Sequence, residues 1–171
     1  VDDALGALIK SVERMNIGPV IVIFTSDHGE EFMDHGGMGH TQRLFEELVK
    51  VPLIVNFPRA KSKRVSKIVS LLDIPPFILN SCKMDIPESF MGMDLLEKMT
   101  SENDHPAFFE TQRKDGLYSG VRIDNCKYIC GHKELLFDLE SDPKESVNLA
   151  VGRGRRITEC NALIQQHRKS I

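Results

Sequence analysis

Five apolar residues run directly into a polar turn in the segment Val20-Ile21-Val22-Ile23-Phe24-Thr25-Ser26-Asp27-His28-Gly29-Glu30. A β-branched and aromatic run of this kind, stopped by Ser-Asp-His-Gly, is typical of a parallel strand buried on both faces. Open α/β sheets bind ligands at the carboxyl ends of their strands, so we expect Asp27 and His28 where both can turn toward one cation. The alternative is an ordinary turn after a strand, with Asp27 as a helix N-cap.

Helices and strands are expected to alternate around this segment, which favours an α/β fold. Residues 1–103 are predicted to hold these elements: an amphipathic helix from Val1 that ends at 16–19, a helix over 41–50, a strand over 51–58 that starts after Pro52 or lies near an edge, a helix from about Asp73, and a turn and short helix after Met91. Residues 104–171 differ: short strand-like pieces at hairpin spacing predict a small antiparallel sheet with a C-terminal helix.

Composition restricts the classes of partner. The chain has 171 residues, 41% of them hydrophobic, and a net charge of −3, so a general polyanion binder is not expected. The basic run at 59–67 has no interleaved aromatic residues and is predicted to be a solvated loop rather than a nucleic-acid contact. No apolar stretch approaches the roughly 18 residues of a membrane span. Because the chain begins at Val1 rather than methionine, an upstream segment is expected.

The four cysteines show neither a CxxC motif nor a dense framework, which indicates reduced thiols. The loop at 31–40 carries three glycines and two histidines, a pattern suited to folding closely around a small anion or metal. His35 and His40 are therefore candidate contacts for a bound group. For His35, packing within the loop is the competing interpretation, because nothing in its spacing demands chemistry.

Motifs in one order along the whole chain resemble the sulfatase family of the alkaline phosphatase superfamily. The matching segments are Thr25–Glu30, Asp34-His35-Gly36, Gly39-His40, Glu46–Val55, Val69–Pro76 ("SLVDLAPT" in the family), Met91–Leu96 ("GxSL"), Arg122 with Lys127-Tyr128 ("R…KY") and Leu136–Leu149 ("LYDLxxDPxExxNL"). The resemblance implies the C-terminal part of an αβα sandwich, the catalytic domain, over 1–103, and a small antiparallel-sheet subdomain with its helix over 104–171.

The resemblance also implies a site. Asp27 and His28 would supply one pair of ligands to a divalent ion, which is calcium in true sulfatases and manganese or zinc in phospho-specific relatives. Imidazole suits the transition ions better than calcium. His40 stands where many sulfatases have a lysine, so it would be the catalytic residue that contacts the substrate oxyanion, with His35 as a second substrate-binding residue. The substrate would be a sulfate ester or, in the alternative, a phosphate ester.

One departure from the family concerns the nucleophile. The family carries it in an N-terminal "C/S-x-P-x-R" segment, and none of the cysteines at 82, 126, 130 and 160 lies in that context. The 171 residues alone are thus expected to be inactive and to need the N-terminal half of the catalytic domain as a partner. Phosphodiesterase or phosphoethanolamine and phosphoglycerol transferase activity is the alternative within the superfamily. A non-catalytic binding or homo-oligomerising module is the alternative of another class.

Overall fold

A computed structural model describes residues 1–58 and 61–170. The chain divides into two compact units, one formed by Val1–Ser26 with Pro52–Arg64 and the other by Asp27–Val51 with Val65–Ile171. These units do not follow the expected boundary after residue 103, so the division into 1–103 and 104–171 stays a prediction. In the basic run at 59–67, Arg59 and Ala60 lie outside the described residues. Residues 61–66 are exposed and form neither helix nor strand, as a solvated loop requires.

The first unit contains one helix and a strand pair. Helix α1 (Asp2–Arg14) confirms the predicted amphipathic helix. Two aspartates in its first turn and an arginine in its last complement the helix dipole. Strand β4 (Leu53–Asn56) begins directly after Pro52, whose missing N–H cannot take part in a ladder, and it pairs with β1 (Val22–Thr25).

The expectation that the strand before Asp27 is parallel and buried on both faces is wrong in both respects. β1 and β4 are antiparallel, with Thr25 opposite Leu53 and Val22 opposite Asn56, so the chain re-enters this ladder at the end where it left. A parallel neighbour would require a crossover to the opposite end. All four residues of β1 are only partly buried. An apolar run in the sequence predicts that a strand packs against a core, but it does not predict whether the strand is parallel or antiparallel to its neighbour.

The second unit contains several short elements before the antiparallel sheet. They are β2 (Glu31–Phe32), β3 (Met38–Gly39), α2 (Glu46–Val49), the 3-10 turn η1 (Leu71–Asp73), α3 (Ile74–Ser81) and α4 (Leu95–Thr100). The helix expected from Asp73 is confirmed, with Pro75 and Pro76 in its first turn, where their missing N–H groups cost nothing. The helix expected over 41–50 is shorter than predicted. Thr41 and Arg43 bind Glu31, and these bonds hold the residues before Glu46 in an irregular conformation.

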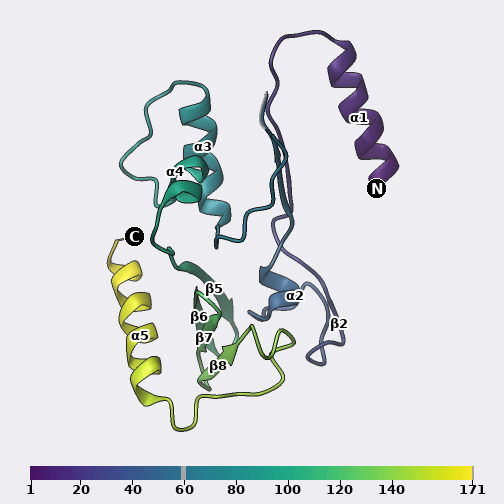
Figure 1. The fold of residues 1–171 in the computed structure, drawn as a ribbon. Coiled ribbons are helices and arrows are strands. Elements are labelled where there is room, and N and C mark those ends of the chain that lie inside the picture. Colours follow the sequence, from purple (N-terminus) through teal and green to yellow (C-terminus); the bar gives the residue numbers. More distant parts are fainter. Residues whose placement is uncertain (59–60, 171) are drawn as a thin grey trace. The chain divides into compact units, whose positions relative to one another are not determined.

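The predicted antiparallel sheet and C-terminal helix are confirmed. Strands β5 (Ala107–Arg113), β6 (Gly116–Ile123), β7 (Cys126–Cys130) and β8 (Leu135–Asp138) pair in chain order, and α5 (Gly154–Lys169, yellow in Figure 1) lies beside them. The core between helix and sheet consists of Val121, Tyr128, Leu136, Ile157, Cys160 and Ile164. Across residues 1–58 and 61–170, the structure contains no helix with both the length and the apolar character to cross a bilayer.

Candidate functional site

The turn after β1 is fixed to α2 through Gly29. The amide of Gly29 donates to the carbonyl oxygen of Leu48 at 2.8 Å. A Cβ atom at Gly29 would lie 1.9 Å from the carbonyl oxygen of Glu47, so only glycine permits this approach of two backbones. The glycine of the Asp-His-Gly sequence therefore sets the position of the two residues before it.

Asp27 and His28 face one another on this turn. Oδ1 of Asp27 accepts a hydrogen bond from the backbone amide of His28 at 3.0 Å, and Oδ2 lies 3.7 Å from Nε2 of His28. Nδ1 of His28 lies 2.8 Å from the Gly29 carbonyl oxygen, which can only accept, so Nδ1 carries a hydrogen. In the neutral ring the lone pair is then on Nε2, the atom that faces Asp27. The Gly29 hydrogen bond and then the Asp27 charge raise the pKa of His28.

His40 belongs to the same cluster. Its ring centroid lies 5.4 Å from that of His28, and its Nδ1 lies 3.4 Å from Oε1 of Glu30. These side chains are accessible: 86% of Asp27, 47% of His28 and 76% of His40 is exposed. The structure thus brings three of the four predicted site residues to one open surface. Glu30 was not predicted to take part, although its position directly after Asp-His-Gly could have indicated it.

His35, the fourth predicted site residue, has a different environment. Its Nδ1 lies 2.6 Å from Oε1 of Glu47, its Nε2 lies 3.4 Å from the carbonyl oxygen of Glu145, and its ring stacks on Phe45 at 3.7 Å between centroids. Burial lowers the pKa of His35, but the hydrogen bond and charge of Glu47 outweigh it and the pKa is raised. Both nitrogens face acceptors, which suits an imidazolium cation. A substrate-binding role for His35 stays a prediction, and the contacts of its ring are those of the packing alternative.

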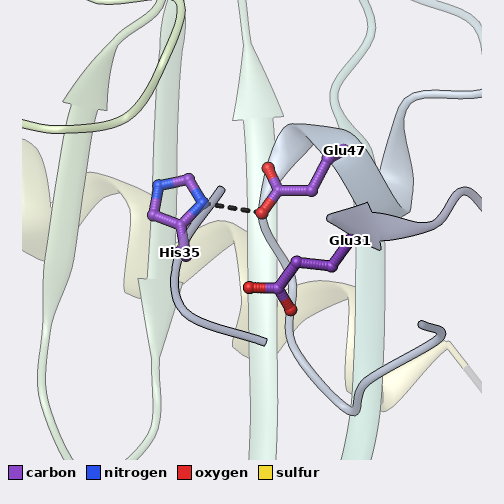
Figure 2. Close-up of side chains that lie close together, drawn as sticks. All are labelled: Glu31, His35 and Glu47. Carbon is purple, nitrogen blue, oxygen red and sulfur yellow. Dashed lines mark hydrogen bonds and ion pairs between the residues drawn. The ribbon is translucent and has the colours of Figure 1, made fainter. Parts of the chain in front are cut away.

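Glu31, His35 and Glu47 form the group in the described residues whose ligand-type atoms lie within 4.8 Å of one another (Figure 2). Glu31 is fully buried and accepts hydrogen bonds from the amide of Gly37, from Thr41 and from Arg43 at 2.6–3.0 Å. Burial raises the pKa of Glu31, but these donors outweigh it and the pKa is lowered. With Arg43 already neutralising Glu31, this group is an ion-paired support for the loop rather than a cation site.

A second group of buried charges links the antiparallel sheet to α2. Lys127, on β7, is fully buried and lies 2.8 Å from Oε1 of Glu145 and 3.1 Å from Oε1 of Glu46. The other carboxylate oxygen of Glu145 accepts from the backbone amide of Glu46 at 2.5 Å, which satisfies a free N–H in the first turn of α2. Arg122 completes the group at 3.2 Å from Glu46. The motifs at Arg122, Lys127 and 136–149 were identified from the sequence, but the sequence did not predict that these residues form ion pairs and hydrogen bonds with α2.

Comparison with known proteins places the chain in a class. The sulfatase family model matches residues 1–83. Arylsulfatase K of Bos taurus is 30% identical over 189 residues, which cover 99% of this chain and 34% of the relative. The chain belongs to the sulfatase family. It spans about a third of the length of the curated relatives that it matches.

Solved structures support the fold. A putative sulfatase of Bacteroides fragilis named yidJ has a TM-score of 0.87 and 25% identity, covering 99% of this chain and 40% of its own. The phosphonate monoester hydrolase of Agrobacterium radiobacter has a TM-score of 0.84 at 22% identity, covering 99% of this chain and 39% of its own. The α/β class and the alkaline-phosphatase-like architecture of its C-terminal portion are thereby confirmed.

Proposed function

We propose that this chain forms part of a metal-dependent sulfuric ester hydrolase and that Asp27 and His28 are two of its metal ligands. The main support is the tautomer of His28, because its Nδ1–H bond to Gly29 leaves the Nε2 lone pair on the side of the Asp27 carboxylate. An oxygen and an imidazole nitrogen 3.7 Å apart are a suitable donor set for one divalent ion. The backbone bond from Gly29 to α2 holds this pair in place before any ligand arrives.

In the proposed reaction, His40 binds the sulfate group. Nδ1 of His40 is oriented by Glu30, so Nε2 is the atom that contacts an oxygen of the ester. In its protonated form His40 donates to that oxygen and stabilises the negative charge that develops there. The bound metal ion would polarise the ester oxygens. The nucleophile is expected from outside these 171 residues, since none of their cysteines lies in the family context.

The metal proposal is tested by isothermal titration calorimetry of the chain with Ca²⁺, Mn²⁺ and Zn²⁺. His28→Ala should weaken binding at least tenfold, because one of two ligands is lost while the turn keeps its Gly29 bond. His132→Ala is the control, since that histidine is exposed and lies 3.9 Å from Asp115, outside this cluster. Equal metal affinity of wild type and His28→Ala would refute the ligand assignment.

The role of His40 requires an activity assay on a longer protein that contains this chain. His40→Ala should lower kcat for p-nitrophenyl sulfate by about 10²-fold and leave the metal content unchanged. Retained kcat would remove His40 from the mechanism, and loss of metal would make it a ligand instead.

Phosphate-ester or phosphonate-ester hydrolysis is the second candidate, and the imidazole of His28 favours it, because nitrogen ligands suit manganese or zinc better than calcium. The same assay with p-nitrophenyl phosphate and an aryl phosphonate separates the two. Turnover of the phosphorus esters exceeding that of the sulfate, with Mn²⁺ or Zn²⁺ preferred over Ca²⁺, would establish this alternative.

A further inference from the structure

A pair of cysteines lies between the antiparallel sheet and α5, in a part of the second unit that the proposed hydrolase site does not use. Cys126 begins β7 and is partly exposed, whereas Cys160 lies in the middle of α5 and is fully buried. Cys160 belongs to the core cluster, and Cys126 packs against that cluster. The pKa values of the two thiols depend on each other: the Cys160 side chain lowers the pKa of Cys126, and the Cys126 side chain raises that of Cys160.

Arg156 makes the two cysteines chemically unequal. It lies one helical turn before Cys160, and its Nε donates to Sγ of Cys126 at 3.4 Å. Glu159 holds the other side of this guanidinium at 3.3 Å. The Cys160 hydrogen bond and the Arg156 cation outweigh burial and lower the pKa of Cys126 to about 6. The thiolate neighbour and burial together raise the pKa of Cys160. Cys126 is thus a nucleophile with a thiol donor beside it.

We propose that Cys126 and Cys160 are an oxidation site, in which the Cys126 thiolate reacts with hydrogen peroxide and Cys160 then closes a disulfide between β7 and α5. The two cysteines lie 34 positions apart in the sequence. A disulfide between them would therefore hold the C-terminal helix against the sheet. This inference does not rest on the proposed hydrolase function.

The chemistry needs no group beyond the peroxide. The Cys126 thiolate attacks one peroxide oxygen, the O–O bond breaks, and hydroxide leaves and takes a proton to become water. The resulting sulfenic acid is attacked by the sulfur of Cys160, whose proton leaves with the second hydroxide as water. In total, two thiols and one peroxide give one disulfide and two waters.

The test is treatment of the full chain with an equimolar amount of hydrogen peroxide, followed by thiol titration and peptide mass spectrometry. The expected result is the loss of two of the four thiols and a Cys126–Cys160 cross-linked peptide lighter by two hydrogens. The matched control is Cys82→Ser, which removes an exposed cysteine and should leave the cross-link unchanged. Oxidation confined to Cys82, or no Cys126–Cys160 peptide, would overturn the proposal.

A second measurement avoids changing a core residue. Arg156→Gln should slow alkylation of Cys126 by iodoacetamide at pH 7 several-fold and move the pH midpoint of the reaction upward, because the thiolate loses its cation. Arg155→Gln is the control, since Arg155 is almost fully exposed and binds Glu159 rather than Cys126. Equal rates for wild type and Arg156→Gln would show that the guanidinium does not activate this sulfur, and would contradict the assignment of Cys126 as the nucleophile.

Discussion

The two histidines of the glycine-rich loop show how strongly the surroundings decide a residue's chemistry. His40 is largely exposed beside His28 and Glu30. His35 is 18% exposed, stacks on Phe45 and has an acceptor at each ring nitrogen. A histidine that donates from both nitrogens is cationic and cannot ligate a metal or act as a base. The same residue type, five positions apart, is therefore open to a ligand at His40 and bonded to Glu47 and the Glu145 carbonyl group at His35.

This ion pair predicts a pH dependence of stability. Glu47 raises the pKa of His35 above its ordinary value, so the stabilising effect is complete below the unfolded-state pKa and is lost as pH rises through the folded-state pKa. Wild type should therefore lose on the order of 1 kcal/mol of unfolding free energy from this pair between pH 6 and pH 8.5. Glu47→Gln should reduce that loss. Urea unfolding at both pH values measures the effect.

The control for this prediction is Glu102→Gln, which changes an exposed carboxylate on the loop after α4. It should keep the pH dependence of wild type. If Glu47→Gln also keeps the pH dependence of wild type, Glu47 does not raise the pKa of His35 in solution.

At the level of elements, α2 is a single turn of helix that several other segments of the chain contact. It has no side-chain cap of its own, and the carboxylate of Glu145 satisfies its first amide instead. Its carbonyl groups at Glu47 and Leu48 contact Gly29 and so hold the turn with Asp27 and His28. So short a helix is unstable in isolation, which means that its neighbours impose its shape.

Gly29→Ala tests this dependence. The added methyl group would lie 1.9 Å from the backbone oxygen of Glu47, which cannot move aside without moving α2. We expect a loss of about 1–3 kcal/mol of unfolding free energy and weaker divalent-ion binding, measured by chemical denaturation and calorimetry. Gly6→Ala, in α1 with no atom within 4 Å of the new methyl, should instead stabilise its helix by up to about 1 kcal/mol. Unchanged stability of Gly29→Ala would contradict the close approach.

Across the molecule, the buried charges link segments that are far apart in the sequence. Lys127 joins Glu46 of α2 to Glu145 of the loop after β8, and its ammonium group lies 5.4 Å from the ring centroid of Phe109 on β5. Burial raises the pKa of Glu145 even though Lys127 is beside it. A carboxylate in this position depends on its cation, since an unpaired buried charge is far more costly than an exposed one.

Lys127→Met should therefore destabilise the chain by about 3–5 kcal/mol, because Glu145 is left buried without its cation while the methionine keeps most of the side-chain volume. Guanidinium unfolding measures the change. Lys133→Met, which alters an exposed lysine before β8, should have little effect.

A double variant distinguishes ion pairing from packing. Lys127→Met combined with Glu145→Gln should lose less stability than the sum of the two single changes, since the second removes the charge that the first leaves unpaired. Additive losses would mean that the pair does not act as a unit.

Local features of the fold could be predicted from the sequence. The prolines after Asp73 placed the start of α3, Pro52 placed the start of β4, and hairpin spacing beyond residue 104 gave four strands in order. Motif order gave the family. In the site, adjacency alone put Asp27 and His28 together, whereas the contact of Gly29 with α2 was not predicted.

Only the tertiary structure decided three features. These are the direction of β1 relative to β4, the length of α2, and the different surroundings of His35 and His40. Each depends on groups that no local pattern connects: Leu53 opposite Thr25, Glu31 holding Thr41 and Arg43, and Glu145 reaching back to Glu46. Capping, turn formation and periodicity act over a few residues and can be read from the sequence, whereas ladder direction and buried charge pairing are settled by partners that only folding brings within reach.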